Sequence, residues 1–136
     1  MTLEDLDTLA RTIFGEARGE AMQGKIAVAY SVINRVKAKS WYGKTITDVC
    51  LKPWQYSCHN QNDPNLAKLH AVTLNDRDLQ LCTYAALAAG LGLIPDPTGG
   101  ATHYHTHSVH PSWAEGKLPV CSIGSHKFYL PQDIDG

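Results

Sequence analysis

The sequence predicts a mainly helical α+β fold with a small β element. Three observations predict it: two stretches of helical periodicity in the first 36 residues, a capped helical segment at 76–89, and short aromatic-rich stretches near the C-terminus. A chain of 136 residues is long enough to bury a core, and no repeat or low-complexity segment divides it. We therefore expect a single domain over residues 1–136.

The first helix is predicted to begin at Thr2 and to end near Glu16. Thr2, with Asp5 three residues later, forms a capping-box pattern. The apolar residues that follow fall on one helical face: Leu6, Leu9, Ala10 and Ile13. Because Glu16 comes seven residues after Leu9, a continuous helix places its carboxylate at the edge of that apolar face.

Two further helices are expected. Residues 24–36 are apolar nearly all round, which is typical of a buried central helix. Residues 76–89 are predicted as a helix with Asn75 as its N-cap, Asp78 in its first turn and Gly90 as its stop.

The remaining segments are predicted as loops and short strands. Residues 41–74 are rich in Pro, Asn, Gln and Ser, and we expect loops there that can include a short hairpin. Residues 91–100 contain two prolines and three glycines and are expected to form a loop. Residues 102–107 and 126–130 alternate or are rich in aromatic side chains, which favours short strands.

Composition narrows the class of protein. Hydrophobic residues make up 43% and charged residues 18% of the chain, as in a folded globular protein. The formal net charge of −1 argues against a nucleic-acid or anionic-membrane partner. The N-terminus carries acids instead of the basic and apolar regions of a signal peptide, and no apolar run approaches the ~20 residues of a membrane span. We expect a soluble protein made in the cytoplasm, with no stable membrane insertion.

The four cysteines leave two alternatives open. Cys50, Cys58, Cys82 and Cys121 match no compact zinc pattern of paired C-x-x-C, and four cysteines allow three pairings that a sequence cannot rank. Partly buried free thiols and at least one disulfide formed after release from the cell are both consistent with the spacing.

The segment Phe14–Glu20 is the sharpest chemical feature. It holds Glu16 and Glu20 with a glycine near each acid, and glycines inside a helix indicate that backbone approaches another group closely. Partial desolvation of Glu16 by its apolar face would raise the pKa of its carboxyl, which suits a general acid. The alternative is an ordinary helix end, with Glu16 or Glu20 paired to Arg18.

A second cluster lies at Pro53–Asn60. Its aromatic rings stand beside amide and hydroxyl groups, the chemistry that binds the flat faces and hydroxyls of sugars. The alternative is a polar loop anchored by Trp54. Ser57 lacks the G-x-S-x-G pattern of a nucleophile, and Cys58 and His59 are chain neighbours that would point apart on a strand.

A third cluster contains His103, His105 and His107, with Tyr104 between the first two. On a strand the three histidines share a face, so they could present imidazoles to a metal, line a polar groove wall, or serve the structure. His-x-His by itself is weak evidence for a metal, and we expect no metal and no cofactor.

Taken together and in order, these clusters resemble the SleB-like cell-wall hydrolase family, which includes spore cortex-lytic enzymes and phage lysins. The resemblance runs from about Leu9 to Leu130. The matching segments are Ile13–Glu20, Gly24–Ala29, Val32–Val36, Pro53, Gln55–Ser57, Gly100–His105, Pro111–Trp113 and Ile123–Tyr129.

The resemblance implies a lysozyme-like fold, with a helical domain and a small sheet flanking a glycan groove. It implies Glu16 as the catalytic acid and cleavage of the bond between N-acetylmuramic acid and N-acetylglucosamine, often by lytic transglycosylation. The substrate-binding residues that we expect at the groove are Glu20, Gln55, Tyr56, Ser57, His103, Tyr104, His105 and His126. The expected partner is peptidoglycan, bound by a monomer.

The spore enzymes carry a signal peptide and a wall-binding domain, and this sequence shows neither. We therefore expect a phage or prophage endolysin that reaches the wall through holin pores. A single carboxylate favours lytic cleavage, whereas hydrolysis normally uses two acids, with Glu20 as the second. The sequence also leaves open a zinc amidase that uses His103, His105 and His107, and a non-catalytic wall-binding module.

Overall fold

The computed structural model describes residues 1–135, and its helices pack around α1 (Leu3–Ala17). The predicted capping box is confirmed: Thr2 Oγ1 accepts the Asp5 N–H and Asp5 Oδ2 accepts the Thr2 N–H, each at 3.0 Å. Leu9 and Ile13 are fully buried, so the apolar face of α1 forms part of the core. The helix ends one residue after Glu16, as its spacing predicts.

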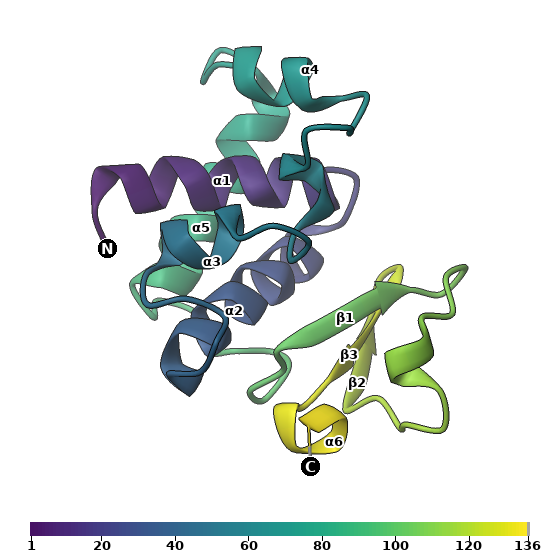
Figure 1. The fold of residues 1–136 in the computed structure, drawn as a ribbon. Helices are drawn as coiled ribbons and strands as arrows, with labels where there is room; N and C mark the ends of the chain where they lie inside the picture. Colours follow the sequence, from purple (N-terminus) through teal and green to yellow (C-terminus); the bar gives the residue numbers. More distant parts are fainter. Residues whose placement is uncertain (136) are drawn as a thin grey trace.

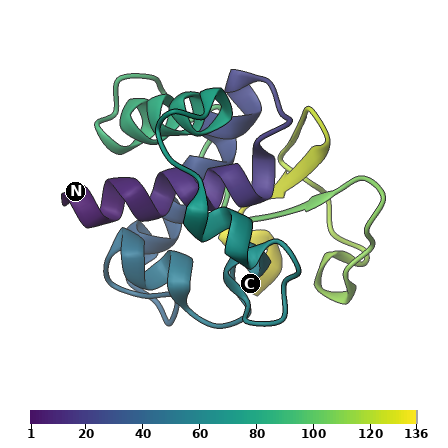
Figure 2. The same cartoon turned by 90° about the horizontal axis from the view of Figure 1, so that it is seen from above.

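The central helix is α2 (Met22–Ala38), which contains the apolar stretch expected at 24–36. Five of its residues are completely buried: Ala27, Val28, Ala29, Ser31 and Val32. Helix α5 (Arg77–Gly90) packs on both α1 and α2. Seen from above, α1 crosses the molecule with α5 on one side and α3 (Ile46–Leu51) on the other (Figure 2).

The N-cap expected for the third helix was off by one residue. Asp76, not Asn75, caps α5, because its Oδ1 accepts the N–H of Leu79 at 3.1 Å. The preceding turn is closed by the Asp76 N–H donating to the carbonyl of Thr73, which leaves Asn75 inside that turn. Gly90 is the last residue of α5 and not the residue after it.

The segment 41–74 is more regular than predicted. It contains α3, the 3-10 turn η1 (Ser57–His59) and α4 (Leu66–Ala71), and it contains no hairpin. Thr45 caps α3, since its hydroxyl accepts the Asp48 N–H at 3.0 Å. These turns place η1 against α1.

The β element is a three-stranded antiparallel sheet in the order β1-β3-β2. The predicted strands are confirmed to within one residue as β1 (His103–Thr106) and β3 (His126–Tyr129), whereas β2 (Cys121–Ile123) was not expected. Figure 1 shows the sheet beside the helices, with η2 (Ser112–Ala114) and α6 (Pro131–Asp135) at its outer side. The predicted class, mainly helical α+β, is confirmed.

The cysteines are free thiols; Cys50, Cys58 and Cys82 are buried and Cys121 is half-buried. Of the two alternatives left open by the sequence, free thiols or a disulfide, the structure of residues 1–135 shows free thiols. No helix in that part of the chain has the length and apolar character needed to cross a membrane.

Candidate active site

Glu16 lies in the last turn of α1, where the helix faces strand β1. Its side chain is half-buried, and its Oε1 accepts the hydroxyl proton of Tyr104 at 2.6 Å. Tyr104 comes from β1, so this single bond joins the helical part of the molecule to the sheet. A distance of 2.6 Å is typical of a hydroxyl that donates to a carboxylate.

Burial raises the pKa of the Glu16 carboxyl above its ordinary value. Hydrogen bonds from the Tyr104 hydroxyl and from the Cys58 backbone and thiol oppose this effect, and the negative charge of Asp63 adds to it. Because desolvation outweighs the hydrogen bonds, Glu16 holds its proton to a higher pH than an exposed glutamate does. That is the property a general acid needs, and the partial burial predicted for Glu16 is found.

Gly15 allows η1 to lie directly on α1. A Cβ at this position would be 2.5 Å from Cys58 Cβ and 2.7 Å from its Sγ, so any larger side chain would push Cys58 away from Glu16. The close approach predicted from the glycines is therefore right for Gly15. It is wrong for Gly19, where a Cβ would have no neighbour within 4 Å. Within residues 1–135 Arg18 pairs with no acid; its guanidinium lies 4.7 Å from the centre of the Phe14 ring.

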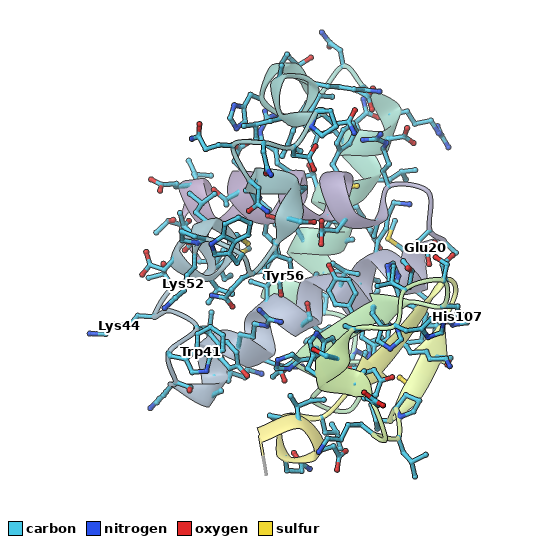
Figure 3. All side chains as sticks on the ribbon, turned by 45° about the vertical axis from the view of Figure 1, so that its right-hand side comes forward. Glu20, Trp41, Lys44, Lys52, Tyr56 and His107 are labelled. Atoms are coloured by element: carbon cyan, nitrogen blue, oxygen red, sulfur yellow. The ribbon has the colours of Figure 1, made fainter. Side chains whose placement is uncertain are left out.

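The Gln55–Ser57 segment, expected to bind sugar, splits into three different environments. Tyr56 is 1% exposed and shares a 2.9 Å hydrogen bond with Ser31 Oγ, so its hydroxyl points into the core and not into a groove. Gln55 accepts from Arg35 at 2.6 Å and donates to the Tyr42 carbonyl at 2.7 Å. Ser57 is exposed at the start of η1. Figure 3 shows Tyr56 near the middle of the molecule.

Arg35 is a buried residue of α2 whose role no sequence motif indicated. Its guanidinium donates to the Thr102 carbonyl at 2.7 Å and lies about 5 Å from the rings of Tyr42 and Tyr56. It thereby joins α2 to the start of β1 and to the loop before η1. A charged residue among the apolar side chains of Val32, Ile33 and Val36 was the available signal for this role.

Glu20 and His126 hold the sheet against the helices. Both Glu20 oxygens accept from Ser125, at 2.8 Å from its N–H and 3.0 Å from its hydroxyl, and these bonds, led by the backbone one, lower the pKa of Glu20. His126 is 3% exposed, with its Nδ1 3.5 Å from Glu20 Oε1 and its ring centre 5.0 Å from that of Tyr104. Glu20 therefore supports Glu16 indirectly, through His126 and Tyr104.

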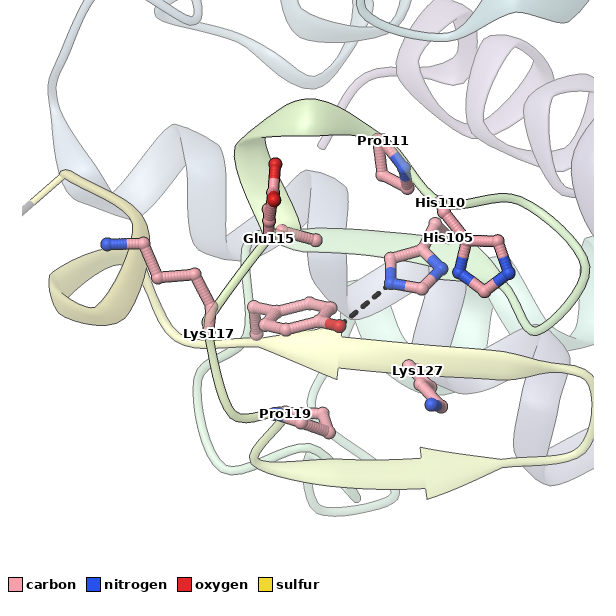
Figure 4. A pocket seen from close by; sticks show the side chains of 9 residues that line it. His105, His110, Pro111, Glu115, Lys117, Pro119 and Lys127 are labelled. Atoms are coloured by element: carbon pink, nitrogen blue, oxygen red, sulfur yellow. Dashed lines mark hydrogen bonds between the residues drawn. The ribbon is translucent and has the colours of Figure 1, made fainter.

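The alternation of β1 sends its histidines away from Tyr104. His103 and His105 both lie against Trp113, whose ring centre is 5.2 Å from that of His103 and 5.7 Å from that of His105. His107 is exposed beyond the end of the strand. His105 bonds the Tyr129 hydroxyl at 2.8 Å, at the edge of a cleft of about 450 Å³ on the outer side of the sheet (Figure 4). Within residues 1–135 no three His, Cys, Asp or Glu side chains are placed to hold a metal ion together.

A family model described as Cell Wall Hydrolase matches residues 19–129. The chain belongs to the cell wall hydrolase family. Glu16 lies three residues before the matched region, so the support for its role is the geometry around its carboxyl. The family resemblance seen in the sequence is confirmed.

Two relatives are spore cortex-lytic enzymes. That of Halalkalibacterium halodurans is 26% identical over 125 residues, and that of Bacillus cereus is 30% identical over 125 residues. The aligned segment covers 91% of this cell wall hydrolase but only 34% and 43% of those two relatives. The chain therefore spans less than half the length of these curated relatives.

A solved structure has the same fold. It is the catalytic domain of the germination-specific lytic transglycosylase SleB from Bacillus anthracis, with a TM-score of 0.75 and 27% sequence identity. The match covers 95% of this cell wall hydrolase and 96% of that domain. The lysozyme-like arrangement expected from the sequence is confirmed by this likeness.

Proposed function

We propose that this protein cleaves the glycan strands of peptidoglycan between N-acetylmuramic acid and N-acetylglucosamine, as a lytic transglycosylase with Glu16 as the general acid. The observation that carries the proposal is the Glu16 carboxyl itself, partly desolvated at the end of α1 and held by the Tyr104 hydroxyl at 2.6 Å. Membership of the cell wall hydrolase family and the likeness to a SleB catalytic domain support the substrate class.

In the first step, protonated Glu16 donates its proton to the glycosidic oxygen. The bond between that oxygen and C1 of the muramic residue breaks, and the glucosamine residue leaves with a 4-hydroxyl. Burial and the neighbouring Glu16 charge raise the pKa of Tyr104 well above its ordinary value. Tyr104 therefore remains a donor and stabilises the carboxylate that Glu16 becomes.

In the second step, the 6-hydroxyl of the same muramic residue attacks C1. Its proton passes to the Glu16 carboxylate, so a 1,6-anhydro ring forms and Glu16 returns to its starting state. One carboxylate is enough for this sequence of steps. Glu20 is a poor second acid, because both its oxygens are engaged by Ser125.

Hydrolysis is the second candidate, and one observation favours it. Asp63 is close enough to Glu16 for its negative charge to raise the pKa of that carboxyl. A hydrolase needs a second carboxylate to activate water or to attack the sugar, and Asp63 is a candidate because its charge acts on Glu16. Asp63→Asn should lower activity strongly under hydrolysis and only mildly under lytic cleavage.

Mass analysis of the products of purified peptidoglycan tests the proposal. Lytic cleavage gives fragments with anhydro-muramic ends, hydrolysis gives reducing ends, and an amidase gives free stem peptides. Anhydro ends are expected. Reducing ends would show that the reaction is hydrolysis and not lytic cleavage. Intact strands with bound protein would indicate a non-catalytic binding module.

The endolysin role stays a prediction, and so does action on the wall after release from the cytoplasm. Cells that make the protein in the cytoplasm should lyse when a holin is co-expressed, and should not lyse when the holin is omitted or when Glu16→Gln is used. Lysis without a holin would contradict that role.

A further inference from the structure

A second cleft of about 490 Å³ lies on the helical side of the molecule, between the end of α3 and η1. The residues that line it are Leu51, Lys52, Pro53, Trp54, His59, Asn60, Gln61 and Asn62. We call it the Trp54 cleft. In Figure 3, Lys52 and Trp41 lie at one side of the molecule and Glu20 and His107 at the other, with Tyr56 between them.

Trp54 is unusual in two independent ways. Its side chain is 81% exposed, so packing against the protein does not account for its position. Its φ is +71°, in the left-handed region where a bulky L-residue is rare and strained. Strain of this kind persists where the surrounding structure enforces it and is concentrated at ligand-binding sites.

Apart from Lys52 and His59, the lining of the Trp54 cleft is uncharged and rich in amides. Within the described residues, the side chains of Asn60, Gln61 and Asn62 make no hydrogen bond to protein, so their donors and acceptors are available to a ligand. The Lys52 ammonium is already engaged, since it donates to the Trp41 carbonyl and lies 5.4 Å from the centre of that ring.

This lining differs from that of the cleft in Figure 4, which carries Glu115, Lys117 and Lys127. An exposed indole beside uncharged amides matches an N-acetylated pyranose, which offers an apolar ring face together with hydroxyl and acetamido groups.

The Trp54 cleft lies close to the proposed catalytic acid. His59, one of its lining residues, bonds Thr12 Oγ1 at 2.8 Å, and Thr12 precedes Glu16 by one turn of α1, or ~6 Å. Cys58, the neighbour of His59, lies directly against Gly15, the residue before Glu16. The cleft is therefore lined in part by the turn η1, which packs on α1 next to Glu16.

We propose that the Trp54 cleft is a glycan subsite beside Glu16, in which one N-acetylated sugar ring stacks on Trp54 and its polar groups bond Asn60, Gln61 and Asn62. The subsite rests on the proposed function, because it binds the same strand that Glu16 cuts. It adds to that function the residues that set the position of the strand.

The test uses the Glu16→Gln protein, which keeps the cleft intact and should not cut the ligand. Isothermal titration calorimetry with the N-acetylglucosamine hexamer, and co-sedimentation with purified peptidoglycan, measure binding. Trp54→Ala and Trp54→Gly in that background should weaken binding about tenfold or more, and Trp54→Tyr should retain most of it. Tyr84→Ala is the matched control, since Tyr84 is 57% exposed on α5, and its binding should be unchanged.

The melting temperature separates binding from structure. Trp54→Gly should melt at or above the parent temperature, because glycine tolerates a positive φ. Equal binding by the parent and Trp54→Ala would overturn the subsite and leave the proposed function standing. A fall in melting temperature in both Trp54→Ala and Trp54→Gly would also overturn it, because the ring would then be structural. Failure of the Glu16→Gln parent to bind either probe would overturn both proposals.

Discussion

Tyr104→Phe isolates the hydrogen bond that the structure places on the proposed acid. The substitution removes the hydroxyl that donates to Glu16 Oε1 at 2.6 Å and keeps the ring, whose centre lies 5.0 Å from that of His126 and 5.7 Å from that of Phe128. The packing of β1 on the helices should therefore survive. The change acts on the proton affinity of Glu16.

The expected size of the effect follows from the charge on the acceptor. A hydrogen bond to an ionised group contributes about 1.5 kcal/mol or more, and 1.36 kcal/mol corresponds to about one pKa unit. The Tyr104 hydroxyl favours the ionised form of Glu16, so its loss raises the pKa of that carboxyl. Protonated Glu16 then persists to a pH about one unit higher.

The pH profile of kcat/KM on labelled peptidoglycan measures this shift. Since the first step needs protonated Glu16, activity falls as pH rises through its pKa, and this alkaline limb should move up by about one pH unit in Tyr104→Phe. Tyr84→Phe, on the exposed face of α5, should leave the profile unchanged. An alkaline limb at the same pH in Tyr104→Phe and wild type would refute the assignment of Glu16 as the acid that Tyr104 holds.

Three other predictions follow from the contacts. Burial raises the pKa of Asp5, but the hydrogen bonds from Thr2 and Thr47 together outweigh it and lower that pKa from 3.8 to about 2. The resulting stabilisation of about 2 kcal/mol is present above pH 4 and is lost as pH falls from 4 to 2. Unfolding at pH 7 should therefore show Asp5→Asn less stable than wild type by about that amount, and the stability of Asp5→Asn should fall less than that of wild type between pH 4 and pH 2. Tyr56→Phe should lower the melting temperature, because the Tyr56 hydroxyl is buried and bonded to Ser31. Ser57 is exposed, so Ser57→Ala should lower turnover and leave the melting temperature unchanged. The opposite pattern would make Ser57 the structural residue and Tyr56 the one that acts on substrate. Extended EDTA treatment should leave most lytic activity intact, and a loss restored specifically by zinc would support the zinc amidase.

Local sequence patterns were enough for the parts of the fold that are held by local contacts. The Thr2–Asp5 capping box and the end of α1 near Glu16 both depend on residues within a few positions of each other. The same signal was available at Thr45 and Asp48, where the capped helix was missed. Helix α3 is only six residues long, so its apolar periodicity spans fewer than two turns and is too short to show a helical repeat.

Strand β2 was missed for a related reason. Cys121–Ile123 has three residues, too few to show alternation, and its strand conformation is fixed by pairing with β3. The two-residue turn Gly124–Ser125, in which Gly124 has a φ of +56°, was the available hairpin signal. A substituent on Gly124 would also meet Glu20 Oε1 at 2.3 Å, a contact that no local pattern predicts.

The site depends on long-range contacts, which sequence spacing does not reveal. Tyr104 lies 88 positions after Glu16, and only the packing of the sheet on α1 brings them together. The direction of Tyr56 is set by Ser31 on α2, 25 positions away, which is why a residue predicted to face sugar is buried. Trp54, considered as a possible anchor of its loop, is instead among the most exposed of the large hydrophobic side chains.

The stability of Glu16→Gln provides the control for the central measurement. Burial raises the pKa of Glu16 in the folded state, so the folded protein loses stability as pH rises through that pKa. Glutamine has no charge to bury, and Glu16→Gln should therefore melt at or above the wild-type temperature at neutral pH. Any loss of activity can then be assigned to chemistry.

Release of soluble fragments from purified peptidoglycan by Glu16→Gln tests the central claim most directly. Glutamine keeps the shape and the hydrogen bond to Tyr104 but cannot deliver a proton, so the rate should fall to about a hundredth of wild type or less, while glycan binding persists. Glu20→Gln, which keeps an oxygen for Ser125, is the matched control and should retain substantial activity. Near wild-type release by folded Glu16→Gln would contradict the assignment of Glu16 as the catalytic acid.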